Sequence, residues 1–226
     1  MDTAEADAVR AVVFDFDGLL MDTESTSFLS WQYEWSQWGL TLQAADFFVN
    51  HGGDVTQDRY AKLAAAVGPR FDRTASHRRR VAYREKLHEE LDLADGLREW
   101  LEEAAGTGLR LAVASSSPLD WLRTHLRRAG VLDTFEVLAG GDEVAHHKPA
   151  PDVYQLALDR LTLSCAAAVA VEDTAHGVAA AHAAGMRCIA IPNPFVAAEC
   201  VRHADLVLSS ASQLRLADAL SAATNP

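Results

Sequence analysis

The sequence has few cysteines and no long apolar run. Among its 226 residues it has three cysteines, Cys165, Cys188 and Cys200, and their spacing is not that of a metal site. A sparse, odd set of cysteines is typical of the reducing cytoplasm, so we expect a cytoplasmic location. No segment approaches the roughly 20 apolar residues of a membrane helix. The N-terminal MDTAEADA lacks the basic and apolar regions of a signal peptide, so we expect neither a membrane anchor nor secretion.

Positive charge is also scarce. The chain has 20 basic and 32 acidic residues and a formal net charge of -12, which argues against nucleic acid as a partner. The imbalance is uneven, because residues 23–93 contain 9 basic and 10 acidic residues and the rest contain 11 and 22. Residues 23–93 should therefore repel an anionic ligand less than the rest of the chain does. No feature points to an obligatory protein partner.

The chain from residue 96 onward alternates between helical and strand patterns. Amphipathic segments such as GLREWLEEAAGTG end at glycine, and short apolar runs such as LRLAVAS and AAVAVED lie between them. Such alternation with short loops predicts βαβ units in a mostly parallel, doubly wound Rossmann-like α/β sheet. The apolar run AVVF, which begins at Ala11, predicts the first strand of the same sheet.

Residues 23–93 interrupt this alternation and contain no convincing strand. Phe28, Trp31, Trp35 and Trp38 recur at helical spacing, and two further helices are expected at residues 55–67 and 74–91. We therefore predict a helical domain at 23–93, inserted into a core domain made of residues 1–22 and 94–226. The tryptophans are more typical of the core of this insert than of a ligand-binding wall.

Polar residues follow the predicted strands at the points where the strands end. Asp15 and Asp17 follow the first strand, and three serines from Ser115 follow the second. Glu172 and Asp173 follow a later strand. Lys148, in the HHKPAPD loop, is one of only three lysines in the chain. Because ligands of parallel α/β sheets bind beyond the carboxyl ends of the strands, these groups should converge at one edge.

Phosphoryl transfer is the chemistry that fits these groups. Like-charged carboxylates next to buried strands are unfavourable unless a cation compensates them, and clustered oxygen donors select Mg²⁺. A carboxylate can accept a phosphoryl group as an aspartyl phosphate, while a hydroxyl and a lysine hold the other phosphate oxygens.

Four segments together resemble the four motifs of the haloacid dehalogenase superfamily: FDFDGLLMDTE, VASSS, HKPAPDVY and VEDTAHGVAAAHAAGM. The helical insert is similar to the cap of that family. The resemblance covers nearly the whole chain and is greatest to β-phosphoglucomutase and to the small sugar-phosphate and phosphoglycolate phosphatases. It implies a Mg²⁺-dependent hydrolase of a small phosphorylated metabolite.

The resemblance also implies roles for the residues after the first strand. Asp15 would be the nucleophile and a Mg²⁺ ligand. Asp17 would be the general acid and base and would bind the metal through its backbone carbonyl. Gly18 matches the glycine that lets the chain turn away from the strand and is expected near the phosphate.

The remaining motifs supply the other implied roles. Ser115 would bond the transferring phosphoryl group, with Ser116 beside it. Lys148 would neutralise Asp15 and the phosphate. Asp173 would bind Mg²⁺, and Glu172 would bind it directly or through water.

Two positions refine the expected reaction. Asp17 supplies an acid two residues after the nucleophile, which true haloacid dehalogenases lack, so phosphate esters are favoured. The β-phosphoglucomutase that the chain resembles has a histidine at the position of Ser27. The lack of that histidine favours transfer of the phosphoryl group to water over a β-phosphoglucomutase-like reaction.

Other interpretations are open at this stage. A phospho-receiver domain also combines acids, a hydroxyl and a lysine on a parallel sheet, but its phosphorylated aspartate follows a later strand and it has no cap. An inactive binding protein would be expected to have lost one of the groups. The serines from Ser115 could simply cap the helix that follows Pro118, and Thr174 with Asp173 could cap the helix from Ala175.

Overall fold

The computed structural model describes residues 8–48 and 55–225. The chain divides into two compact units. One unit, here called the sheet unit, contains the residues up to Asp22 and those from Asp92 onward, and the other, here called the helical unit, spans Thr23–Leu91. Within the described residues, no helix is long and apolar enough to cross a membrane.

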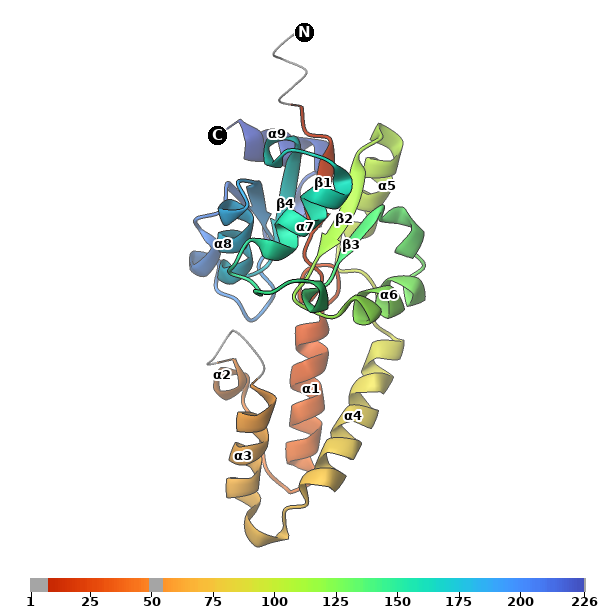
Figure 1. The fold of residues 1–226 in the computed structure, drawn as a ribbon. Helices are drawn as coiled ribbons and strands as arrows, with labels where there is room; N and C mark the ends of the chain where they lie inside the picture. Colours follow the sequence, from red (N-terminus) through yellow and green to blue (C-terminus); the bar gives the residue numbers. More distant parts are fainter. Residues whose placement is uncertain (1–7, 49–54, 226) are drawn as a thin grey trace. The chain divides into compact units, whose positions relative to one another are not determined.

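The sheet unit is built on one six-stranded parallel sheet with the order β3-β2-β1-β4-β5-β6 (Figure 1). Its first strand lies in the interior of the sheet, between β2 and β4, and the predicted α/β fold is confirmed. The strands are β1 (Ala11–Phe14), β2 (Arg110–Ala114), β3 (Val137–Ala139), β4 (Ala168–Glu172), β5 (Arg187–Ala190) and β6 (Leu206–Val207).

Helices of the sheet unit follow the strands as the alternating pattern predicts. They are α5 (Leu97–Thr107), α6 (Leu119–Arg128), α7 (Asp152–Leu161), α8 (Ala175–Ala183) and α9 (Leu216–Thr224). Helices α7 and α8 contact each other and the sheet, and α5 and α9 also contact each other and the sheet. Since helices must cover both faces of a parallel sheet, its central strands consist almost entirely of apolar residues.

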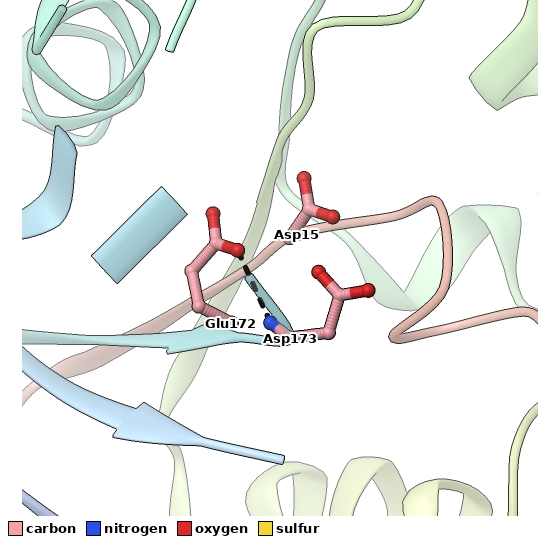
Figure 2. Close-up of side chains that lie close together, drawn as sticks. All are labelled: Asp15, Glu172 and Asp173. Carbon is pink, nitrogen blue, oxygen red and sulfur yellow. Dashed lines mark hydrogen bonds between the residues drawn. The ribbon is translucent and has the colours of Figure 1, made fainter. Parts of the chain in front are cut away.

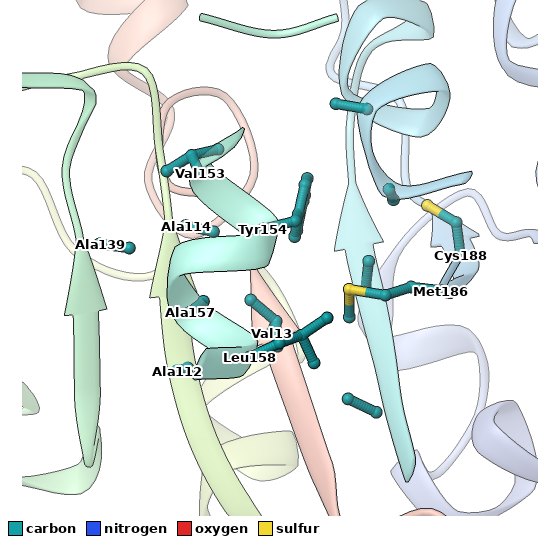
Figure 3. Close-up of a cluster of buried hydrophobic side chains, with 14 of the residues drawn as sticks. Val13, Ala112, Ala114, Ala139, Val153, Tyr154, Ala157, Leu158, Met186 and Cys188 are labelled. Carbon is teal, nitrogen blue, oxygen red and sulfur yellow. The ribbon is translucent and has the colours of Figure 1, made fainter. Parts of the chain in front are cut away.

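One face of the sheet packs on α7 and α8 through small and medium-sized side chains (Figure 3). Val13, Ala112 and Ala170 come from the strands, and Tyr154 and Leu158 come from α7. Small strand residues let the helices approach closely, so this core is dense and contains few large side chains. It fixes the central strands whose ends carry the polar residues.

The helical unit contains no strand among its described residues. Its helices are α1 (Thr23–Ser36), α2 (Ala44–Phe47), α3 (Thr56–Val67) and α4 (Arg73–Glu89). The helices expected near 55–67 and 74–91 are therefore confirmed, and α1 packs along α4. Trp31 is buried with its ring centroid 4.4 Å from that of Tyr60, which is a core position.

Trp31 and Trp35 also line a cavity of about 330 Å³ inside the helical unit. Leu42 and Phe47 add to its apolar wall, and Arg59 and Lys62 lie at it. None of the acids from the strand ends lines this cavity.

Candidate active site

Asp15, Glu172 and Asp173, here called the acid cluster, meet where neighbouring strands end. Phe14 pairs with Val171 in the β1–β4 register, and the Asp15 N–H donates to the Val171 carbonyl at 2.9 Å. Asp15 therefore emerges beside the end of β4, and one carboxylate oxygen from each member lies within 4.8 Å of the others (Figure 2). Two adjacent parallel strands are thus sufficient to bring the three acids together.

Lys148 is the cation of this site. Its Nζ donates to Asp15 Oδ1 at 2.5 Å, to Glu172 Oε1 at 2.6 Å and to the Ala114 carbonyl at 2.9 Å. The side chains of Lys148, Asp15 and Glu172 are only 8%, 10% and 1% exposed. One buried ammonium thus faces three buried carboxylates, so the cluster has excess negative charge when it is fully ionised.

The pKa values of the site reflect burial first and this excess of negative charge second. Burial, together with the charge of Glu172, raises the pKa of Asp15 to about 7, although Lys148 opposes the shift. Burial and the charges of Asp15 and Glu172 raise the pKa of Asp173 well above its usual value. Burial disfavours the Lys148 ammonium, but the charges of Asp15 and Glu172 outweigh burial and raise its pKa. A divalent cation would offset both the cost of burying these carboxylates and the repulsion between them, which together raise the two carboxyl pKa values.

The donor set of the acid cluster fits a hard metal ion. Asp173 Oδ2 accepts a hydrogen bond from Asn193 at 2.7 Å, whereas Asp173 Oδ1 is buried and has no hydrogen-bond partner among the described residues. A buried carboxylate oxygen without a donor is costly. Carboxylate oxygens are the ligands that Mg²⁺ prefers, so Asp15, Glu172 and Asp173 are suited to bind it.

Gly18 and Gly177 make room for these carboxylates. Gly18 has a φ of +82°, and a Cβ atom there would lie 2.2 Å from Asp173 Oδ2. A Cβ atom on Gly177 would lie 1.9 Å from the Glu172 carboxyl group. The predicted turn at Gly18 is therefore present, and the glycine borders the acid cluster.

The side chain of Asp17 does not lie with the other acids. Its Oδ2 accepts a hydrogen bond from Ser117 Oγ at 2.6 Å and a longer one from Ser115 Oγ at 3.4 Å, while its Oδ1 accepts from Trp121 Nε1 at 3.1 Å. The acid cluster does not include it. Of the four acids expected at this edge, the structure brings together three carboxylates and directs the fourth toward α6.

The serines after β2 have different environments. Ser115 is buried, and its Oγ accepts a hydrogen bond from the Ser117 N–H at 3.0 Å, whereas Ser116 is exposed. Pro118 occupies the N-cap position of α6, and the first N–H of the helix, that of Leu119, donates to Asp142 Oδ1 at 2.9 Å. Helix capping therefore does not account for these serines. Thr174 caps α8 by accepting from the Gly177 N–H, and the expected share of Asp173 in that cap is wrong, because its Oδ2 accepts from Asn193 instead.

Four residues that contact the site are not among the predicted site residues. Tyr154 donates its hydroxyl to Glu172 Oε1 at 2.6 Å, and Asn193 holds Asp173. Trp121 holds Asp17, and Gly177 borders Glu172. Asn193 carried a usable signal, because it follows the apolar run RCIAIP and so lies at a further strand end. Tyr154 and Trp121 lie within amphipathic helices, where a polar contact cannot be distinguished from packing by periodicity.

Residues 12–191 match the family model described as haloacid dehalogenase-like hydrolase. The chain belongs to this family. It is 32% identical over 183 residues to the phosphorylated carbohydrates phosphatase of Thermotoga maritima, covering 80% of this chain and 84% of that one. It is 29% identical over 184 residues to fructose-1-phosphate phosphatase YqaB of Escherichia coli (79% and 94% covered).

A solved structure shows the same similarity. A haloacid dehalogenase family hydrolase from Deinococcus radiodurans, with bound phosphate and sodium, has a TM-score of 0.80 and 26% identity to this chain, covering 97% of this chain and 99% of that one. The expected membership of the β-phosphoglucomutase and phosphoglycolate phosphatase group is confirmed, and the chain is a phosphoric monoester hydrolase. The receiver-domain interpretation is therefore wrong.

Proposed function

We propose that this enzyme is a Mg²⁺-dependent phosphatase that hydrolyses a small phosphorylated metabolite, a sugar phosphate or a similar compound, through an aspartyl phosphate on Asp15. The observation that carries the proposal is the acid cluster, in which three buried carboxylates lie together and the buried ammonium of Lys148 pairs with two of them, Asp15 and Glu172. Such an arrangement is unfavourable for a protein that only needs to be stable, and it suits a site that binds a cation and an anionic substrate together.

The proposed metal ligands are Asp15, Asp173, the backbone carbonyl of Asp17 and Glu172, the last directly or through water. When bound, Mg²⁺ supplies positive charge that compensates the carboxylates and the phosphate oxygens. Asp173 Oδ1, which has no hydrogen-bond partner in the part of the chain that the structure describes, supports the place of Asp173 in this set.

Asp15 is the proposed nucleophile. An oxygen of its carboxylate attacks phosphorus, a bond from that oxygen to phosphorus forms, and the ester bond between phosphorus and the leaving oxygen breaks. Asp17 donates a proton to the leaving oxygen, which departs as an alcohol. Lys148, which donates to Asp15 and Glu172, adds positive charge beside the transferring group.

Water completes the reaction in the second half. Asp17, now a carboxylate, accepts a proton from the attacking water, whose oxygen bonds to phosphorus. The bond between phosphorus and Asp15 breaks, inorganic phosphate leaves and the carboxylate is regenerated. Ser115, Ser116 and Gly18 are proposed to contact the phosphoryl oxygens during both halves.

The two units are proposed to act as a core domain of residues 1–22 and 94–226 and a cap domain of residues 23–93. The substrate class rests on relatives whose names give a phosphorylated carbohydrate and fructose 1-phosphate as substrates. A cytoplasmic location, and the absence of nucleic acid, membrane or an obligatory protein as partner, stay predictions.

The deciding experiment is an assay of the purified enzyme on a panel of sugar phosphates, phosphoglycolate and p-nitrophenyl phosphate. We expect release of inorganic phosphate with Mg²⁺, no turnover in excess chelator and inhibition by Ca²⁺, which accepts a looser geometry. Full turnover in excess chelator contradicts the proposed role of the metal.

The same assay separates a phosphatase from a mutase. With β-glucose 1-phosphate, phosphorus NMR should show inorganic phosphate as the product. Accumulation of glucose 6-phosphate without phosphate release would instead support the β-phosphoglucomutase-like alternative.

A further inference from the structure

The backbone around Asp17 is fixed by the turn that follows β1. The Gly18 N–H donates to the Met21 carbonyl at 2.8 Å, and the Met21 N–H donates to the Phe16 carbonyl at 3.2 Å. Asp17 and Met21 also form a parallel bridge, and Phe16 is fully buried. With the backbone constrained in this way, the side-chain torsions of Asp17 and its hydrogen-bond donors decide where its carboxylate lies.

Ser117 and Trp121, which come from one region, hold the two oxygens of this carboxylate separately, and Ser115 adds the longer bond to Oδ2 at 3.4 Å. Ser117 Oγ donates to Oδ2 at 2.6 Å, and Trp121 Nε1 donates to Oδ1 at 3.1 Å. Both donors come from the loop and first helical turn after β2, about 100 residues away in sequence. A fork of two donors determines both the position and the plane of a carboxylate, whereas a single donor leaves it free to rotate.

Trp121 is itself held in place by a closed chain of contacts. Its ring lies 3.9 Å, centroid to centroid, from that of His125, and His125 Nδ1 donates to the Trp121 carbonyl at 2.9 Å. The buried His125 ring also packs on Phe16, at 6.1 Å between centroids. Phe16 directly precedes Asp17, so the chain returns to the residue that Trp121 holds. The contacts of Trp121 with His125, and of His125 with Phe16, therefore fix the direction of the indole N–H.

We propose that Trp121, assisted by Ser117, is a positioning residue for the acid–base carboxylate of Asp17. This inference rests on the role of Asp17 given under Proposed function. The indole N–H sets the orientation from which Asp17 exchanges protons with the leaving oxygen and with water. Attack by Asp15 on phosphorus does not use the Asp17 carboxylate. Loss of the indole donor should therefore slow proton exchange by Asp17 more than it slows attack by Asp15.

The test is Trp121→Phe, which keeps an aromatic ring beside His125, removes the N–H donor and makes the ring smaller. We expect kcat for an alkyl phosphate to fall about tenfold, the order expected for losing one hydrogen bond to a charged group. Formation of the phosphoenzyme from p-nitrophenyl phosphate, whose leaving group needs little protonation, should change less than about twofold. Ser117→Ala should show the same selectivity and serves as the second variant if Trp121→Phe folds poorly.

A matched control is Trp100→Phe. Trp100 is also buried and also donates its indole N–H, to the Leu214 carbonyl at 2.9 Å, but it lies on α5 and does not contact Asp17. Its variant should leave the ratio of the two rates unchanged. If Trp121→Phe and Ser117→Ala both leave the ratio of the alkyl phosphate rate to the p-nitrophenyl phosphate rate unchanged, the inference is overturned.

A double-mutant cycle with Asp17→Asn distinguishes the inference from the function on which it rests. If Trp121 acts through Asp17, adding Trp121→Phe to Asp17→Asn should cause no further selective loss. If Asp17→Asn alone fails to reduce alkyl phosphate turnover selectively, the role of Asp17 is wrong. If Asp17→Asn is selective and Trp121→Phe is not, only the positioning role of Trp121 is wrong.

Discussion

Both units of this protein bury charged side chains, but they compensate the charges differently. In the helical unit, Glu34 is fully buried and accepts hydrogen bonds from Arg79 at 2.6 and 3.2 Å and from Trp38 at 3.0 Å. In the sheet unit, Lys148 serves both Asp15 and Glu172, and an oxygen of Asp173 has no donor among the described residues.

Arg80, a buried arginine of the helical unit, also has polar partners, although these are neutral. Arg80 is 4% exposed, donates to Tyr60 Oη at 2.9 Å and to Ser30 Oγ at 3.3 Å, and lies 4.5 Å from the centre of the Trp31 ring. Hydroxyls and the negative face of an aromatic ring replace water around the guanidinium. Buried charge alone therefore does not indicate a functional site here. A cluster of carboxylates close enough to share one metal ion does, and among the residues described the acid cluster of the sheet unit is the one such group.

The largest effect should come from Asp15→Asn, which removes the proposed nucleophile. We expect turnover to fall by more than about 10³-fold and no phosphoenzyme to form. The same change removes one of three repelling carboxylates, so the metal-free protein should become more stable at neutral pH, where the raised pKa of Asp15 makes its ionised form costly. Phosphate trapping after acid quench and thermal melts in chelator measure the two effects. A phosphoenzyme on the variant would contradict the assignment.

Glu34→Gln should have the opposite effect on stability. The fully compensated Glu34 loses its charged pairing with Arg79, and we expect the free energy of unfolding to fall by about 2 kcal/mol. The outcome should appear in urea unfolding with the m-value unchanged, and Glu85→Gln, at an exposed position of α4, is the control. If Glu34→Gln stabilised the protein as Asp15→Asn should, the contrast between the two units would be wrong.

The response to pH should sharpen the comparison further. The pKa of Asp15 rises from a usual 3.8 to about 7 on folding. Between these values the unfolded chain has lost a proton that the folded protein retains, so without metal the stability should fall as pH rises through this window. Added Mg²⁺ must replace that proton and should therefore stabilise the protein more at pH 8 than at pH 5. Melting temperatures at several pH values, with and without Mg²⁺, check both statements, and Asp15→Asn should flatten the metal-free slope.

The smallest effect should come from an exposed ion pair. Arg98 donates to Asp92 at 2.7 Å, but these side chains are 43% and 64% exposed. Water and salt screen such a pair, so Arg98→Ala should change the free energy of unfolding by less than about 1 kcal/mol. Chemical unfolding at low and high salt would measure it. A loss as large as that of Glu34→Gln would show that burial is not what separates strong from weak pairs in this protein.

The sequence by itself determined the elements and their order. The alternation of apolar runs with amphipathic segments predicted the parallel sheet that includes β1, and the missing strand pattern predicted the helices of residues 23–93. The meeting of Asp15, Lys148, Glu172 and Asp173 was also predictable. Hydrophobic periodicity is local, and the carboxyl ends of parallel strands share one edge, so these features need no knowledge of side-chain directions.

Only the tertiary structure decided how the polar groups are divided and compensated. Asp17 lies two residues from Asp15, yet its carboxylate turns toward Trp121, which is 104 residues away in sequence. Tyr154 and Asn193 became partners of Glu172 and Asp173 because α7 and the loop after β5 pack beside the strand ends. Such contacts depend on rotamers and on the close packing of distant segments, which residue patterns do not encode. For the same physical reason, the sequence could not distinguish the complete pairing of Glu34 from the incomplete pairing of the acid cluster.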